Sequence, residues 1–398
     1  MLIKLDTIVL KVASRCNIDC TYCYEYNRGD TSWKQQPKKF SLENSVILSE
    51  RINEYARTNT ITHFNVVFHG GEPALAGSQH LDQVMTCLED RCTIPLRFGM
   101  QTNGTLVNSE LINVLKKHNV RVAVSIDGTE YANRHRIDHD GKPTWARAIK
   151  GIVALKGAGL FSGIQVVIDG YERPEDILAT LMQFSPPEIE LGQPFGTFDN
   201  PPQAFSNDTS LGEWLLRAFV CWVSTPSLVG TRVIILADAL RAVLSDESIS
   251  EWFPTRPPGY LIVAADANLE GLDTLKISGD AGRILNLNIR EHSFEQALQH
   301  PQIQMRARQT VERPDACQQC AIKEWCNGGY YPTRHMQGSG FNNKSIYCSD
   351  WMTLFDGIGR WAIQQDQVSP EKKHEIAARL ARLKEQVQSG LLQHHVRV

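Results

Sequence analysis

Short apolar runs of the β type alternate with segments of helical periodicity in the first half of the chain. The runs cover residues 6–13, 63–73, 96–104, 120–128, 161–170 and 188–196. Between two of them, Leu111, Val114 and Leu115 recur at i, i+3 and i+4 after Asn108 or Ser109, either of which can cap a helix. Strands that alternate with amphipathic helices predict parallel βαβ units, so we expect an α/β protein.

Size and charge limit the possible partners. The 398 residues, 42% of them hydrophobic, suffice for a full-size domain and a smaller one. A net charge of -3, with both signs spread along the chain, gives no basic stripe for nucleic acid. No apolar run approaches the roughly 18 residues that span a bilayer, and charged residues interrupt the N-terminal stretch where a signal peptide would be apolar. We expect a cytoplasmic protein without nucleic-acid or membrane partners.

Cysteines carry the strongest chemical signal. In a reducing compartment they serve as metal ligands, reactive groups or buried apolar residues more often than as disulfides. Seven of the ten form two groups, Cys16, Cys20 and Cys23 near the start and Cys317, Cys320, Cys326 and Cys348 near the end. Cys87, Cys92 and Cys221 stand in helical contexts, and we assign them no chemistry.

The first group is one ligand short of a closed zinc site. Zinc in structural sites takes four ligands, and no further Cys or His follows until His63. A 4Fe-4S cluster bound by three thiolates keeps one iron open to a substrate or cofactor. A zinc site and a 4Fe-4S cluster with one open iron are therefore the two alternatives for these cysteines.

The CxxxCxxC spacing in "SRCNIDCTYCYEYN" resembles that of the radical S-adenosylmethionine (SAM) enzymes. The resemblance implies that SAM binds the open iron of a 4Fe-4S cluster held by Cys16, Cys20 and Cys23. One electron then cleaves SAM to a 5'-deoxyadenosyl radical, which abstracts hydrogen from an unactivated carbon. It also places Tyr22 beside the adenine.

Further motifs at strand ends match the same family. "GGEP" (Gly70, Gly71, Glu72, Pro73) ends the second run, where glycines permit close approach of the backbone to a ligand. By resemblance this motif holds the SAM amino group, while Asn103, Ser125 and Asp127 lie around the ribose and carboxylate and Arg136 contacts SAM. Without a ligand, each of these residues would serve as an ordinary strand-end cap or turn residue.

Six βα units predict a partial (β/α)6 barrel of the TIM type, with its active site at the carboxyl ends of the strands. We expect this barrel over residues 1–230, a smaller iron-sulfur extension over 231–365 and a C-terminal helix over 366–398. In that helix Ile376, Leu380 and Leu383 share one face.

The second cysteine group resembles the SPASM extension of radical SAM proteins that modify peptides and proteins. Residues 260–277 and 284–298 share that resemblance. The full pattern has seven cysteines, but Lys276 and Tyr330 stand at two of its positions. One auxiliary 4Fe-4S cluster on Cys317, Cys320, Cys326 and Cys348 is therefore expected, as a structural element or an electron relay, with structural zinc as the alternative.

The stretch from Cys20 to Pro37 resembles maturases that join an aromatic ring to a β-carbon of a ribosomal peptide, forming a cyclophane. The expected partners are a precursor peptide and a flavodoxin- or ferredoxin-type electron donor. Because the chain begins at the barrel, we expect no N-terminal leader-binding domain.

Other activities stay open. A sulfatase-maturing enzyme would carry a catalytic Asp after the cysteine replaced by Lys276, but Ile277 stands there, and Asp199 and Asp280 are read as loop carboxylates. Thioether formation and epimerisation are further SPASM reactions, and a zinc-stabilised adaptor is the non-enzymatic alternative. We name no catalytic residue.

Overall fold

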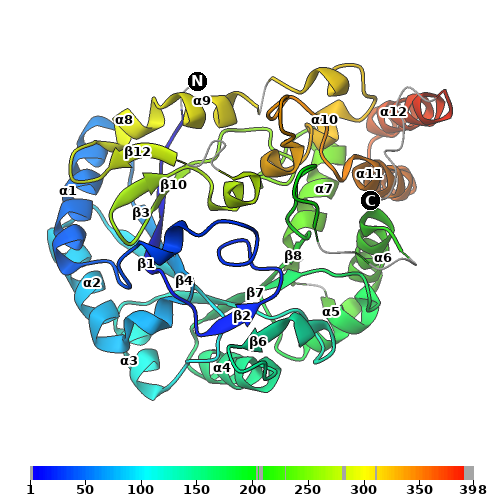
Figure 1. The fold of residues 1–398 in the computed structure, drawn as a ribbon. Helices are drawn as coiled ribbons and strands as arrows, with labels where there is room; N and C mark the ends of the chain where they lie inside the picture. The colour runs from blue at the N-terminus through cyan, green and yellow to red at the C-terminus, as the bar shows by residue number, and fades with distance from the viewer. Residues whose placement is uncertain are drawn as a thin grey trace. The chain divides into compact units, whose positions relative to one another are not determined.

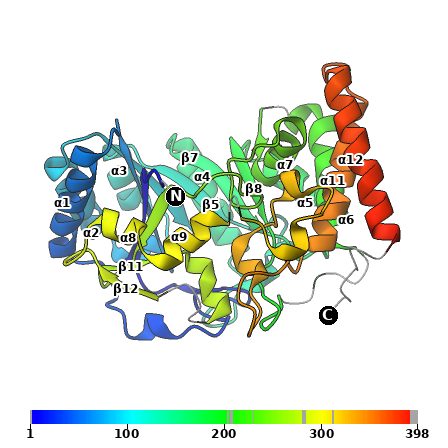
Figure 2. The same cartoon turned by 90° about the horizontal axis from the view of Figure 1, so that it is seen from above.

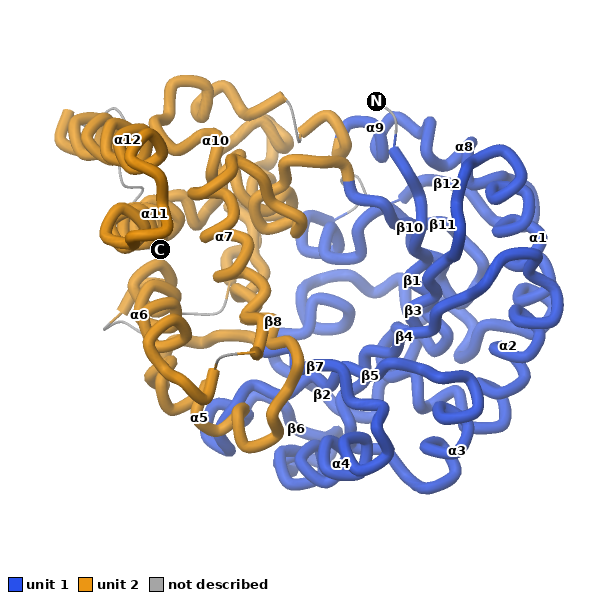
Figure 3. The backbone as a smooth tube through the Cα atoms, turned by 180° about the vertical axis from the view of Figure 1, so that it is seen from behind, with its two compact units in different colours: residues 1–166, 258–305 blue, residues 167–257, 306–398 orange. Residues whose placement is uncertain are grey.

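The chain divides into two compact units, which are described separately. The structure is a computed structural model that describes residues 3–202, 205, 209–228, 230–279, 284–309 and 312–389. Unit 1 comprises Met1–Val166 and Pro258–Met305, and unit 2 comprises Val167–Pro257 and Arg306–Val398 (Figure 3). These units are defined by contacts, and the domain limits expected from the sequence stay a prediction.

All six strands expected from the apolar runs form, and the α/β class is confirmed. They are β1 (Thr7–Ala13), β3 (Phe64–Gly70), β4 (Leu96–Thr102), β5 (Arg121–Ser125), β7 (Phe161–Val167) and β8 (Glu188–Gly192). From β1 to β7 each strand pairs in parallel with the next in the order β1-β3-β4-β5-β7. The carboxyl ends of these strands therefore share one edge of the sheet.

The sheet of unit 1 continues on the other side of β1. There β10 (Tyr260–Val263) pairs in parallel with β1, and β11 (Asn268–Glu270) and β12 (Ile284–Asn288) follow antiparallel. The segment that the sequence assigned to the extension thus adds strands beside β1. This places residues 268–278 near the end of the first strand.

Helices connect the parallel strands of unit 1 and lie outside them (Figure 1). They are α1 (Leu42–Thr58), α2 (Ser78–Arg91), α3 (Ser109–Lys117) and α4 (Trp145–Gly157), with α8 (Phe294–Leu298) and α9 (Pro301–Arg308) later in the chain. Asn108 caps α3 as predicted, because its side chain accepts the N–H of Leu111 at 2.9 Å. Leu111 and Leu115 are buried, which confirms the apolar face of this helix.

Unit 2 is mainly helical outside β8, which pairs in parallel with β9 (Arg232–Val233). Its helices are α5 (Pro174–Met182), α6 (Leu211–Ser224), α7 (Ile234–Ser245), α10 (Lys323–Cys326), α11 (Cys348–Ile363) and α12 (Pro370–Gln388). Helix α11 packs against α6, α7 and α12 (Figure 2). The predicted face of α12 is confirmed, since Ile376, Leu380 and Leu383 are buried. None of the described helices is both long enough and apolar enough to cross a membrane.

Close packing in unit 1 yields the first prediction. A Cβ at Gly151 in α4 would lie 2.1 Å from the carbonyl oxygen of Gly104, whereas a Cβ at Gly157, in the same helix, would meet no atom within 4 Å. Gly151→Ala should therefore lower the free energy of unfolding by about 1–3 kcal/mol, because α4 must move away from the strand-end loop. Urea denaturation of Gly157→Ala provides the control, and an equal response of both variants would contradict this packing.

Candidate active site and cluster sites

The first three cysteines lie on a loop of unit 1 that leaves the carboxyl end of β1. The loop contains β2 (Ile18–Cys20), which pairs antiparallel with β6 (Arg136–Asp138), so that Cys20 lies opposite Arg136. The N–H of Cys23 then donates to the carbonyl of Cys20 at 3.0 Å. The four- and three-residue spacings thus correspond to a short strand followed by a turn.

Burial shapes the chemistry of these thiols. It raises the pKa of Cys20 to about 11 and that of Cys23 to about 12, and it raises the pKa of Cys16 as well. Because a desolvated thiolate needs a cation nearby, such thiols fit metal ligation. Within the described part of the chain, no three Cys, His, Asp or Glu side chains converge on the position of a single ion. Three buried thiols are a donor set that suits a 4Fe-4S cluster with one open iron.

Tyr22, Asp127 and Arg136, expected around SAM, are bonded to one another. The Tyr22 hydroxyl donates to Asp127 Oδ2 at 2.5 Å, and Arg136 donates to both carboxylate oxygens, at 3.0 and 3.1 Å. Burial disfavours the Arg136 cation, but Asp127 outweighs that effect and raises the pKa of the guanidinium. Its Nη1 lies 4.0 Å from the sulfur of Cys20. A fixed positive charge therefore lies next to a proposed cluster ligand.

Glu72 braces two neighbouring strands. It is fully buried, and its carboxylate accepts the Thr102 hydroxyl at 2.7 Å and the Asn103 N–H at 2.8 Å. Pro73 begins the short η2 turn (Pro73–Ala76) directly after it. The acid thus joins the end of β3 to the end of β4, and a contact with SAM stays a prediction.

The two glycines of GGEP allow close contacts within the protein. Gly70 has a φ of +131°, and a Cβ there would lie 2.0 Å from the carbonyl oxygen of Ala13. A Cβ at Gly71 would lie 1.9 Å from the Tyr26 hydroxyl and 2.5 Å from the carbonyl of Arg15. Larger residues would push β3 away from β1 and from the cysteine loop, independently of any ligand.

Asn103 and Ser125 occupy the ends of β4 and β5. Asn103 donates through Nδ2 to Asn17 Oδ1 at 2.9 Å, and the same nitrogen lies 3.8 Å from the sulfur of Cys16. Ser125 accepts from Gln101 Nε2 at 2.7 Å. Asn103 is therefore tied to the cysteine loop, whereas Ser125 bonds within the strand ends.

A buried ion-pair network, which our sequence analysis missed, lies behind the loop. Lys11 Nζ is 2.6 Å from Glu25 Oε1 and 3.1 Å from Glu270 Oε2, while Lys276 pairs with the other oxygen of Glu25. Lys276 Nζ also lies 3.5 Å from Asp30 Oδ2. The available signal was Lys11 itself, a charged residue inside an apolar strand. Two lysines thus hold the segment that follows Cys23.

The same region contains two further titratable groups. Tyr24 donates its hydroxyl to Asp273 Oδ2 at 2.9 Å. Burial alone would raise the pKa of Asp273, but the positive charge of Lys11 and the hydrogen bond from Tyr24 outweigh it, so the pKa is lowered. Burial lowers the pKa of His69, whose Nδ1 has no hydrogen-bond partner among the described residues. This region therefore contains an ionised carboxylate, that of Asp273, and a neutral imidazole, that of His69.

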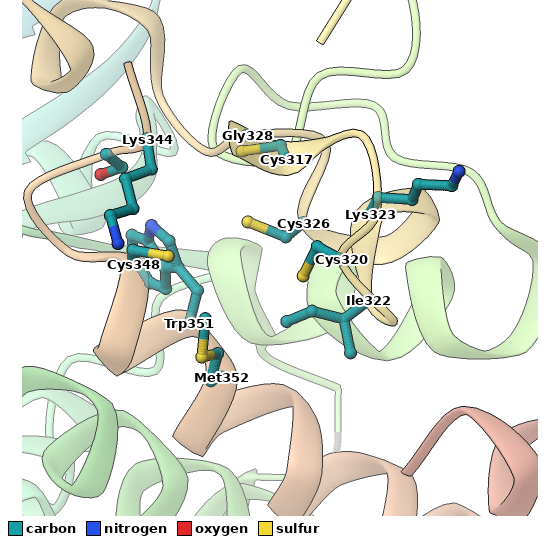
Figure 4. A pocket seen from close by; sticks show the side chains of 11 residues that line it. Cys317, Cys320, Ile322, Lys323, Cys326, Gly328, Lys344, Cys348, Trp351 and Met352 are labelled. Carbon is teal, nitrogen blue, oxygen red and sulfur yellow. The ribbon is translucent and has the colours of Figure 1, made fainter. Parts of the chain in front are cut away.

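The second cysteine group lines one pocket of unit 2 (Figure 4). The four sulfurs belong to Cys317 in η6 (Asp315–Cys317), to Cys320, to Cys326 at the end of α10 and to Cys348 at the start of α11. The pocket contains about 320 Å³ of space not filled by protein atoms, part of which is open to solvent. Burial raises the pKa of all four thiols, to about 12 for Cys348. Four thiols around one pocket are a donor set that suits either a 4Fe-4S cluster or a structural zinc ion.

Tyr330, at a position where the full SPASM pattern has cysteine, packs in an aromatic group of unit 2. Its ring centroid lies 5.0 Å from that of Trp252 and 5.8 Å from that of Phe195. Trp252 donates to Glu190 at 2.9 Å, and burial raises the pKa of this acid to about 8. Of the two loop carboxylates, Asp280 lies outside the described residues, and Asp199 accepts the Gln337 N–H at 2.7 Å.

Comparisons with known proteins agree with this geometry. Residues 10–183 match the Radical SAM superfamily. The chain is 24% identical over 372 residues to a serine-type anaerobic sulfatase-maturating enzyme of Klebsiella aerogenes, covering 89% of this chain and 85% of that protein. It is 28% identical over 179 residues to the uncharacterized protein MJ0907 of Methanocaldococcus jannaschii, covering 44% of this chain and 58% of that one.

Solved structures share the fold. Native anSMEcpe with bound AdoMet and Cp18Cys peptide has a TM-score of 0.78 at 17% identity, covering 91% of this chain and 98% of that one. Streptococcus suis SuiB bound to precursor peptide SuiA has a TM-score of 0.59 at 16% identity, covering 87% and 76%. The predicted partial (β/α)6 barrel with a smaller extension is confirmed as the fold class.

Residues 10–183 are a radical SAM domain, with the cysteine loop and strand-end motifs described above. A domain of this type indicates an enzyme, and the chain is similar to proteins that modify peptides or proteins. A radical SAM domain implies SAM and a 4Fe-4S cluster.

The buried ion pairs generate the second prediction. Lys276→Met should lower the free energy of unfolding by about 3–5 kcal/mol, because it removes one of the two lysines that neutralise the buried carboxylate of Glu25. Lys142→Met is the control, since Lys142 and its partner Asp140 are 72% and 76% exposed and such pairs contribute little. Urea denaturation of the reconstituted protein measures both, and equal small losses would contradict a stabilising role of Lys276.

Proposed function

We propose that this protein is a peptide maturase that forms a carbon-carbon cross-link between a β-carbon and an aromatic ring. The observation that carries the proposal is the buried three-thiol loop, beside which Tyr22 and Arg136 both hydrogen-bond to Asp127. The stretch from Cys20 to Pro37 supports the cyclophane type of cross-link. The peptide-modifying relatives support a precursor peptide as the partner.

The assignment of ligands follows the sequence motifs. Cys16, Cys20 and Cys23 would hold the 4Fe-4S cluster. SAM would lie near the GGEP residues, Asn103, Ser125, Tyr22, Asp127 and Arg136. When bound, the cluster and SAM together supply a 5'-deoxyadenosyl radical. The protein positions the peptide carbon against that radical and keeps water away from it.

The proposed reaction balances as a two-hydrogen oxidation. Hydrogen abstraction leaves a radical at Cβ of one peptide residue, and this carbon forms a bond to a neighbouring aromatic ring. Loss of one proton and one electron then restores aromaticity. Asp273, a buried carboxylate of unit 1, would accept the proton. The auxiliary cluster on Cys317, Cys320, Cys326 and Cys348 would accept the electron, and a flavodoxin- or ferredoxin-type protein would exchange electrons with the enzyme.

A sulfatase-maturing activity is the second candidate, favoured by the near full-length similarity to the Klebsiella enzyme. Against it, Lys276 and Ile277 replace the cysteine and catalytic Asp of that family. Lys276 also forms a buried ion pair with Glu25. Thioether formation and epimerisation have no supporting observation beyond the shared SPASM resemblance.

Product mass and fragment spectra together distinguish these reactions, because oxidation of serine to formylglycine and thioether formation also remove two hydrogens. Incubation of the reduced enzyme with SAM and its cognate peptide should give a product about two mass units lighter, because a cross-link removes two hydrogens. Fragment spectra should locate the loss between a β-carbon and an aromatic residue. An epimerised peptide would keep its mass, and SAM cleavage with an unchanged peptide would contradict the cross-linking proposal.

Metal content tests the two clusters. After anaerobic reconstitution, about eight irons per chain should fall to about four in the Cys16→Ala/Cys20→Ala/Cys23→Ala variant, with loss of SAM cleavage, since seven thiolates serve two 4Fe-4S clusters. Iron, sulfide and zinc are measured together. About four irons with retained zinc in the parent protein would reassign the second cysteine group to a structural zinc site.

A further inference from the structure

One face of α11 contributes three side chains to the pocket of the second cysteine group. Cys348 begins the helix, and Trp351 and Met352 follow at i+3 and i+4, so all three lie on the same face. Figure 4 shows the indole of Trp351 beside Cys348 at the edge of the pocket. The helix therefore brings an indole N–H to a four-thiolate site.

The indole N–H of Trp351 is unpaired. Trp351 is fully buried, and its Nε1 has no hydrogen-bond acceptor among the described residues. Indole nitrogen can only donate, and a buried donor without an acceptor is unfavourable. The ring packs against Phe253 and Tyr347, with centroid distances of 5.1 and 6.1 Å. A ligand with acceptor atoms in this pocket would satisfy the donor.

The charges around the pocket favour an anionic occupant. Lys344 and Lys323 line it, and none of the side chains lining this pocket is acidic. Figure 4 shows the ammonium end of Lys344 directed toward Cys348. A 4Fe-4S cluster with four thiolates is an anion whose charge becomes more negative on reduction, so nearby positive charge favours reduction.

We propose that Trp351 donates its indole N–H to a sulfur of the auxiliary cluster and, together with the ammonium group of Lys344, raises the reduction potential of that cluster. The inference rests on the auxiliary cluster of the proposed function. Its consequence is directional, since a higher potential makes the cluster an acceptor for the electron that leaves the cross-linked ring. The electron-carrier protein then reoxidises the cluster.

The test uses the Cys16→Ala/Cys20→Ala/Cys23→Ala background, so that only the auxiliary cluster contributes to the signal. Trp351→Phe keeps an aromatic ring against Phe253, whose centroid lies 5.1 Å away, and removes the donor. A redox titration followed by electron paramagnetic resonance should show an equilibrium constant for reduction about tenfold lower, a shift of about 59 mV for one electron. Lys344→Met should shift the potential in the same direction.

Trp325→Phe is the matched control. Trp325 is also fully buried with an unpaired indole nitrogen among the described residues, but its ring faces Phe355 and Arg379 and does not line the pocket. Its potential should equal that of the parent. Equal shifts in both Trp variants, or no shift in Trp351→Phe and Lys344→Met, would overturn the inference.

The metal content separates this failure from that of the proposed function. Four irons per chain with an unchanged potential would contradict only the role of Trp351 and Lys344. Zinc in place of iron would contradict the auxiliary cluster itself and, with it, this inference. If Trp351→Phe binds no iron, the Lys344→Met variant decides the outcome, because that lysine is not part of the hydrophobic core.

Discussion

The buried ion pairs of Glu25 with Lys11 and Lys276 fix the segment on which the first cluster site depends. Glu25 follows Cys23 by two residues, Lys11 belongs to β1, and Lys276 belongs to η5 (Asp273–Ser278) beyond β11. The network therefore joins the first strand, the cysteine loop and a segment about 250 residues later in sequence. Desolvating buried charges costs free energy, so a buried ion pair is weak evidence for stability. We infer that these ion pairs also position the cysteine loop.

Burial affects the thiols of both cysteine groups in the same way. Burial raises the pKa of each thiol, so a protein without metal keeps these groups protonated, whereas iron offsets the desolvation of the thiolates. The groups differ in number and in neighbours. The three-thiol loop has the bidentate Arg136 and Asp127 pair beside it, while the four-thiol pocket has Lys344 and an unpaired indole donor. The two cysteine groups therefore differ in the charged and hydrogen-bonding side chains that surround them.

Much of this organisation was accessible from the sequence, because it is encoded in local patterns. The six apolar runs became strands, Asn108 became a cap, and Ile376, Leu380 and Leu383 became a buried face. Contacts between distant residues were not accessible. Nothing near Lys276 in the sequence indicates Glu25, and nothing near Glu72 indicates that Thr102 and the Asn103 N–H satisfy its carboxylate. Such pairings depend on strand register, which local periodicity does not define.

The replacement of cysteine at two positions has a physical explanation within each unit. A cysteine changed alone would leave its former cluster neighbours around a void or an unpaired charge. In unit 1, Lys276 extends into an acidic cluster and neutralises Glu25. In unit 2, Tyr330 fills its surroundings by packing against Phe195 and Trp252. Both residues therefore make interactions of their own, which is compatible with the single auxiliary cluster proposed above.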